Sequence, residues 1–200
     1  MGQIALNKVL FSFMRVVFVV FLACAALFTV PPSLSAQDLS REEVEQIFRG
    51  KVKEKINLLQ LFIQTIGDKD TKRETLKRTI RSASSLFAAG AVIEVSSKNG
   101  EIERLPVEDY FHHLTKLPYD QVEITFEDNT VGMFRKTNSG NYLVDGTIYQ
   151  HFAGIRNRKT VYSDFTIKNI EIEIVKVVDM NTPKGRYEIV LHNITVVETR

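Results

Sequence analysis

Residues 40–67 carry apolar side chains at intervals of three and four, which is the spacing of an amphipathic helix. Ser40 and Glu43 open this stretch as a capping-box pair, and Gly67 offers a stop. The apolar residues are Val44, Phe48, Val52, Ile56, Leu59, Ile63 and Ile66. The pattern therefore predicts one long helix with a buried side.

A second helical pattern follows over residues 71–90. Thr71 and Glu74 repeat the capping signal, and Gly90 ends the stretch. Its apolar stripe is narrower and consists of Leu76, Ile80, Ala83 and Phe87. We therefore predict a second helix that lies on the surface of the core.

Residues 91–105 predict a short hairpin, because two β-rich segments flank the turn sequence Asn99-Gly100. Pro106 is suited to open the next helix, since its missing amide hydrogen is not needed there. The buried side of this third helix is expected to hold Val107, Tyr110, Phe111, Leu114 and Leu117.

The rest of the chain alternates apolar and polar residues, as half-buried strands do. The predicted strand segments are residues 119–127, 131–136, 142–153, 160–178 and 186–198. Within 160–178 the apolar residues occupy odd positions up to Ile167 and even positions from Ile170. A period of two changes face only at a bulge or a bend, so we expect the sheet to curve near Lys168 and Asn169.

The order helix, helix, hairpin, helix and a run of strands, four of them long, predicts an α+β fold. Three helices would pack against a strongly curved antiparallel sheet and form a cone. The segments 86–94, 149–154 and 161–164 carry a family resemblance. LFAAGAVIE resembles a stretch found in many proteins of the nuclear-transport-factor-2-like superfamily, which has the cystatin-like cone, and YQHFAG and VYSD resemble the central hairpin of its exported bacterial members. That resemblance implies a cavity between helices and sheet. In enzymes of the superfamily, acids, histidines or tyrosines line that cavity.

Residues 1–36 form the pattern of a secretory signal peptide. Lys8 and Arg15 precede an uncharged stretch from Val16 to Val30, and a small residue, Ala36, precedes the expected cut. We expect export to the periplasm or beyond, with residues 37–200 as a single domain. An uncleaved leader would leave the protein anchored in the membrane. Lipidation at Cys24 is disfavoured, because the residues that follow it stay apolar.

Charge gives no support for nucleic-acid binding. The chain has 26 basic and 24 acidic residues, and because Lys8 and Arg15 lie in the leader, residues 37–200 are balanced. This part also has no cysteine, since the one cysteine is Cys24. No phosphate-binding glycine loop or nucleophilic-serine motif occurs, so the sequence indicates no cofactor and no catalytic residue.

Four residues are candidates for ligand binding: Tyr110, His113, Tyr149 and His151. His113 lies at the edge of the apolar side of its helix. Tyr149 and His151 lie on one side of a strand, which is either the cavity side or the solvent side. The adjacent pair His112-His113 predicts no metal site, because neighbouring helical residues diverge.

Two functional hypotheses follow. In the first, the protein is an exported, non-catalytic binding or interaction module for a small apolar molecule or a protein. It would also pair as a homodimer through the sheet, since the last strand is apolar on both faces from Ile189 to Val197. In the second, it is a cofactor-free isomerase, dehydratase or hydrolase that acts on a small apolar molecule inside the cone.

Overall fold

The computed structural model describes residues 40–97, 99–179 and 182–200. The helices are α2 (Arg41–Gly67), α3 (Arg73–Ser84) and α4 (Val107–Thr115). The strands are β1 (Val92–Ser96), β2 (Ile102–Pro106), β3 (Gln121–Lys136), β4 (Tyr142–Arg156), β5 (Lys159–Asp179) and β6 (Thr182–Thr199). The expected leader and its cut after Ala36 fall outside the described residues. Within the described ranges, every helix is too short or too polar to cross a membrane.

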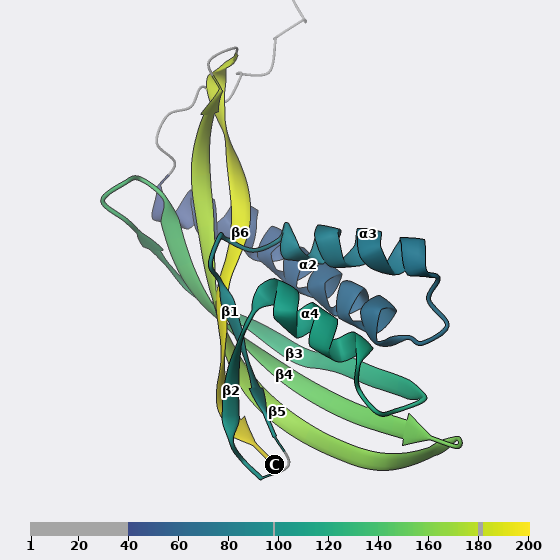
Figure 1. Ribbon diagram of the computed structural model, residues 1–200. Helices are drawn as coiled ribbons and strands as arrows, with labels where there is room; N and C mark the ends of the chain where they lie inside the picture. The colour runs from purple at the N-terminus through teal and green to yellow at the C-terminus, as the bar shows by residue number, and fades with distance from the viewer. Residues whose placement is uncertain (1–39, 98, 180–181) are drawn as a thin grey trace, which may run out of the picture. The chain divides into compact units, whose positions relative to one another are not determined.

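One six-stranded sheet holds the fold together, in the order β2-β1-β6-β5-β4-β3. All neighbours run antiparallel except β1 and β6, which meet in parallel at Ile93 and Ile194. The sheet is curved, and the three helices lie on its concave side (Figure 1). The predicted α+β class, with three helices against a curved sheet, is confirmed.

The start of α2 confirms the capping prediction. Ser40 Oγ accepts a hydrogen bond from the Glu43 amide at 3.3 Å, and Glu43 Oε2 accepts one from the Ser40 amide at 2.8 Å. The predicted apolar residues of this helix are all buried. They face β3, the strand on which α2 packs.

The predicted start and end of α3 are wrong. Its N-cap is Lys72, which makes no side-chain capping bond. Thr71 lies one residue before the cap, and its hydroxyl donates to the Thr65 carbonyl of the preceding helix at 2.8 Å. The helix ends at Ser84 rather than near Gly90, and Phe87 already forms a parallel bridge to Leu191 of β6. Tertiary pairing with β6 therefore ends this helix early.

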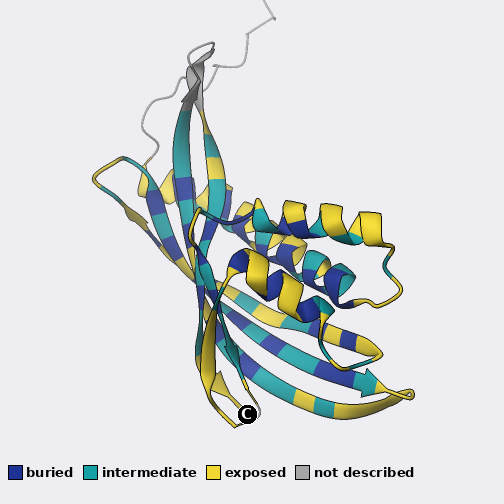
Figure 2. Cartoon of the chain, in the orientation of Figure 1, coloured by how far each residue is buried: buried dark blue, intermediate teal, exposed yellow. Residues whose placement is uncertain are grey.

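Buried residues of α2 and of the sheet belong to one hydrophobic core (Figure 2). Val52, Ile56 and Leu59 of α2 are fully buried. So are Ile170, Ile172 and Ile174 of β5, which form part of the same hydrophobic core. This part of the concave face is filled by side chains.

Candidate functional site

The concave face of β5 changes from apolar to polar along its length. The pairing of β4 with β5 is continuous from Gly154 opposite Tyr162 to Tyr142 opposite Ile174. Even-numbered residues of β5 therefore share one face throughout. Tyr162, Asp164, Thr166 and Lys168 lie on the same side as Ile170, Ile172 and Ile174.

The predicted change of face in β5 is wrong, although irregular pairing does occur near Lys168 and Asn169, where curvature was expected. The register shifts are in the pairing with β6, between Ile167 and Lys168 and between Ile170 and Ile172, and the extra residues belong to β6. The apolar odd positions of β5, including Phe165 and Ile167, lie on the convex face, where they are half-buried. The apparent switch in pattern thus marks the place where the concave face becomes polar.

A cavity of about 280 Å³ lies over this polar segment. Its walls come from the β1–β2 hairpin, α4, and strands β3, β4 and β5. Its lining includes Ser96, Glu103, Leu114, Leu117, Ile124 and Gln150. Its volume is close to the lower end of the roughly 300–1,000 Å³ that is usual for ligand sites.

Lys168 is the most unusual residue in this cavity, because its side chain is charged and the residue is only 4% exposed. Its Nζ donates to the main-chain oxygen of Glu94 at 3.0 Å. Burial lowers the pKa of Lys168 to about 8, although the carboxylates of Asp164 and Glu94 oppose this effect. The amine is therefore close to its titration point near neutral pH.

A chain of hydroxyl and carboxyl groups leads away from Lys168 along β5. Thr166 Oγ1 donates to Asp164 Oδ1 at 3.4 Å. Burial raises the pKa of Tyr162 to about 12, and its hydrogen bond to the Asp164 carboxylate acts in the same direction. Tyr162 thus keeps its proton and serves as a hydrogen-bond donor at neutral pH.

Aromatic side chains form one wall of the cavity. The Phe152 ring meets Tyr119 edge-on at 5.9 Å and Tyr162 at 5.8 Å. Gly154 makes room for this wall, since a Cβ at that position would come within 2.5 Å of the Tyr119 ring. The glycine is therefore required by close packing.

Helix α4 supplies two of the residues that the sequence singled out. Tyr110 is buried and lines the cavity, and burial raises its pKa above the ordinary value. His113 also lines the cavity, from an exposed position on the helix. The helical periodicity thus placed both residues on the side of α4 that faces the hollow.

The structure does not bring Tyr149 and His151 to this cavity. Their neighbours Gln150 and Phe152 line it, so Tyr149 and His151 point to the convex face of the sheet. Tyr149 lies 6.3 Å from Phe165, centroid to centroid, and His151 Nε2 is 2.9 Å from Ser163 Oγ. Alternation showed that the two share a side, but not which side the helices cover.

The residues that sequence reasoning missed are Asp164, Thr166 and Lys168. A signal was present, since all three precede Ile170, Ile172 and Ile174 at the same even spacing. Polar residues on a face that is otherwise buried indicate either a cavity or a polar network. The apolar residues at odd positions obscured this signal, because they favoured a change of face.

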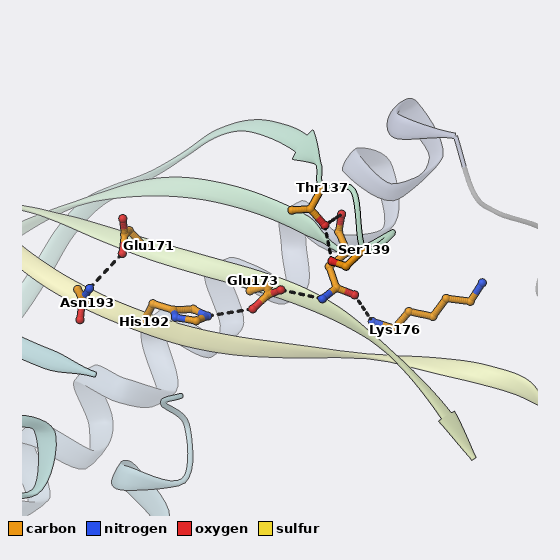
Figure 3. Close-up of polar contacts among 8 residues, drawn as sticks. Thr137, Ser139, Glu171, Glu173, Lys176, His192 and Asn193 are labelled. Atoms are coloured by element: carbon orange, nitrogen blue, oxygen red, sulfur yellow. Dashed lines mark hydrogen bonds and ion pairs between the residues drawn. The ribbon is translucent and has the colours of Figure 1, made fainter. Parts of the chain in front are cut away.

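The convex face carries a separate polar cluster, drawn in Figure 3. His192 Nε2 lies 3.1 Å from Glu173 Oε2, and Asn141 Nδ2 donates to Glu173 Oε1 at 2.7 Å. Glu171 accepts from Asn193 at 3.3 Å. These carboxylates are satisfied by neighbouring strands, so the cluster is explained by sheet pairing.

Other surface hollows offer weaker candidates. One of about 660 Å³ lies beside Asp68, Asp120 and Glu123, and one of about 460 Å³ beside Lys53 and Asp128. Although larger, both are lined mainly by exposed residues. Across the described ranges, no group of three or more His, Cys, Asp or Glu side chains is placed to hold a metal ion.

Comparison with known proteins finds no matching family model and no matching curated sequence. Three solved structures have a related arrangement. They are a protein proposed to be a scytalone dehydratase from Novosphingobium aromaticivorans, ActVI-ORFA from Streptomyces coelicolor and Aln2 from another Streptomyces species.

The first is 8% identical, with a TM-score of 0.44, over 80% of this chain and 90% of that chain. ActVI-ORFA is 9% identical, with a TM-score of 0.41, over 74% and 96%. Aln2 is 10% identical, with a TM-score of 0.40, over 73% and 89%.

Proposed function

We propose that the protein binds a small, neutral, mainly apolar molecule in the cavity beneath α4. Leu114, Leu117 and Phe152 would contact its apolar part, and Lys168 would donate a hydrogen bond to its polar group. The observation that carries the proposal is the composition of this cavity. Apolar walls with a few convergent polar groups are typical of small-molecule sites.

The charges of the cavity favour a neutral molecule over an anion. Lys168 is accompanied by the carboxylates of Asp164 and Glu103. A carboxylate or phosphate ligand would be repelled by both of these negative charges, of which Glu103 is exposed and Asp164 is half-buried. A carbonyl or hydroxyl oxygen accepts a hydrogen bond from Lys168 without that repulsion.

The proposal can be tested with acetophenone, a neutral ketone, added to the purified protein and followed by amide NMR shifts. We expect the shifts to concentrate at residues of β1, α4 and the Tyr162–Lys168 segment. Ser96→Trp should fill the cavity and abolish them. Ser163→Trp is the matched control, since Ser163 lies on the convex side of β5 and this variant should bind normally. Shifts that persist in Ser96→Trp would contradict the proposal.

A second function has one specific observation in its favour. Lys168, with its pKa of about 8, faces the same cavity as the Asp164 carboxyl group, so a bound molecule could exchange protons with an amine that titrates near neutral pH. This arrangement supports a cofactor-free isomerase, dehydratase or hydrolase. In D₂O, the protein should then accelerate exchange of the acetophenone methyl protons, and Lys168→Met should lose this acceleration. Binding without exchange would favour the non-catalytic module.

We further propose membership of the nuclear-transport-factor-2-like superfamily, export, and pairing through the sheet. The support for the superfamily is the curved sheet with three helices on its concave side.

The support for pairing is apolar surface on the convex side and at the C-terminal strand, where Val161 and Val197 are more than half exposed. Light scattering should give the mass of a dimer, and a strict monomer at tens of micromolar would remove the pairing proposal.

A further inference from the structure

The Lys168 amine has more hydrogen-bond donors than the described residues of the protein accept. Among the residues that line the cavity in the described part of the chain, it is the only lysine or arginine. Its single hydrogen bond within the described residues is the one to the Glu94 carbonyl. An ammonium group has three donors, so a molecule in the cavity can engage the same nitrogen.

Lys55 provides an internal comparison. Its Nζ donates to the Ile189 carbonyl at 2.5 Å, and partial burial lowers its pKa, although Glu188 opposes the shift. Lys55 lies on α2, away from the cavity. The two lysines share desolvation and a carbonyl partner, but Lys168 lines the cavity and Lys55 does not.

We infer that Lys168 is a nucleophile that forms a reversible imine with a small aldehyde or ketone held in the cavity. The inference rests on the proposed binding function and adds a substrate class, carbonyl compounds, and a covalent step. Desolvated lysines in apolar pockets are the usual source of such chemistry.

The step balances without a cofactor. The neutral amine of Lys168 attacks the carbonyl carbon, so a C–N bond forms and the carbonyl π electrons move to oxygen. One N–H proton moves to that oxygen, which gives a carbinolamine. The hydroxyl group then leaves as water with the second N–H proton, and the C=N bond forms. If the lysine starts as the ammonium ion, its extra proton first passes to Asp164 or to solvent.

The surroundings of Lys168 favour the attack of its amine on the carbonyl carbon. With a pKa of about 8, about one-tenth of Lys168 is neutral at pH 7, against less than about one-thousandth of an ordinary lysine. Asp164 and Tyr162 face the same cavity and can pass protons to and from the carbinolamine. Leu114, Leu117 and Phe152 add apolar surface to the same cavity.

The test is reductive trapping of the full-length protein at neutral pH with benzaldehyde and cyanoborohydride, followed by peptide mass mapping. Reduction of an imine leaves one benzyl group on the lysine. We expect Lys168 to be labelled more than about tenfold faster than Lys55 and exposed lysines such as Lys77, in line with its larger neutral fraction and its cavity. Lys168→Arg keeps the charge and should abolish the fast label, while Lys55→Arg should leave it unchanged.

The acetophenone experiment separates the possible failures. If acetophenone shifts the cavity residues but Lys168 is labelled no faster than Lys77, the imine inference is wrong and the binding function stands. If neither result appears, both are wrong. Equal labelling of Lys55 and Lys168 would show that desolvation alone sets the reactivity, and this result would also overturn the inference. Protection of Lys168 by benzyl alcohol, which cannot form an imine, would place the reaction in the cavity.

Discussion

The two halves of the concave face of β5 are built on the same alternation but have opposite properties. From Ile170 to Ile174 the inward residues are fully buried isoleucines. From Tyr162 to Lys168 the inward residues are polar or ionisable, and a cavity of about 280 Å³ lies over them. The backbone pairing with β4 is continuous through both halves. The difference therefore comes from side chains and from the element that covers them.

The helices above the two halves differ as well. Helix α2 has 27 residues, and its apolar stripe fills the space against the sheet. Helix α4 has nine residues and presents Tyr110, His113 and Leu114 to the cavity. Long, continuous apolar contact leaves no room for a ligand, while a short helix at the edge of the sheet leaves a hollow. Stability and binding are therefore expected to separate between the halves.

The largest expected effect lies in the apolar half. Ile172→Ala should lower the free energy of unfolding by about 3 kcal/mol, since it removes buried methyl groups and leaves a void. Thr166→Val is the matched change in the polar half. Its hydroxyl makes only two long hydrogen bonds, both at 3.4 Å, so the loss should stay below about 1 kcal/mol. Urea unfolding measures the free energy of unfolding of both variants. Equal losses would contradict the expected difference in stability between the two halves of β5.

The next effect concerns pH and Lys168. Its folded pKa of about 8 lies below the unfolded value, so between pH 8 and pH 10 the unfolded chain binds more protons than the folded one. Stability should therefore rise with pH across this window, by roughly 2 kcal/mol relative to Lys168→Met. The variant also removes a buried charge and should be as stable as wild type or more stable at pH 7.

The same comparison contains its own control. Lys55 contributes a rise of the same sign, because its pKa is also lowered, but it is present in both proteins and cancels in the difference. Above pH 10 the raised pKa values of Tyr110 and Tyr162 act in the opposite direction, since the unfolded tyrosines lose protons first. Parallel pH profiles for wild type and Lys168→Met would show that Lys168 is not desolvated.

A third change tests the aromatic wall of the cavity. Gly154→Ala places a methyl group against the Tyr119 ring, so the ring must shift, and we expect a loss of roughly 1–3 kcal/mol in unfolding free energy. Gly50→Ala is the control, because Gly50 lies in α2 with no atom within 4 Å of the added carbon. That variant should gain up to about 1 kcal/mol from helix propensity. If Gly154→Ala leaves the free energy of unfolding unchanged, the Tyr119 ring is not held in a fixed position.

The smallest effect is electrostatic. Asp164→Asn removes a charge that raises the pKa of Lys168, so that pKa should fall below about 8. The pKa of Tyr162 should fall as well, because its hydrogen bond to the carboxylate is lost. Carbon NMR titration of the lysine side chain measures the first shift. Asp145→Asn, on the convex face beside Arg135, should leave both values unchanged.

Local sequence patterns were reliable where local forces decide the structure. The capping box of α2 and its buried stripe formed as predicted, because the side chain at Ser40 and the helical repeat need no distant partner. The ends of α3 were mispredicted because Thr71 and Phe87 are used by other elements. Half of the candidate ligand residues, Tyr110 and His113, reach the cavity for the same local reason, helical periodicity.

The sequence by itself determined that there are three helices and that Tyr149 and His151 share one side of their strand, since both follow from the repeat of the backbone. Tertiary structure alone decided which face of β4 and β5 the helices cover, so it sent Tyr149 and His151 to the convex side and turned Lys168 inward. The physical reason is that alternation is symmetric between the two sides of a strand. Only the packing of α2 and α4 against one side makes that side the interior, and burial then alters the chemistry of Lys168.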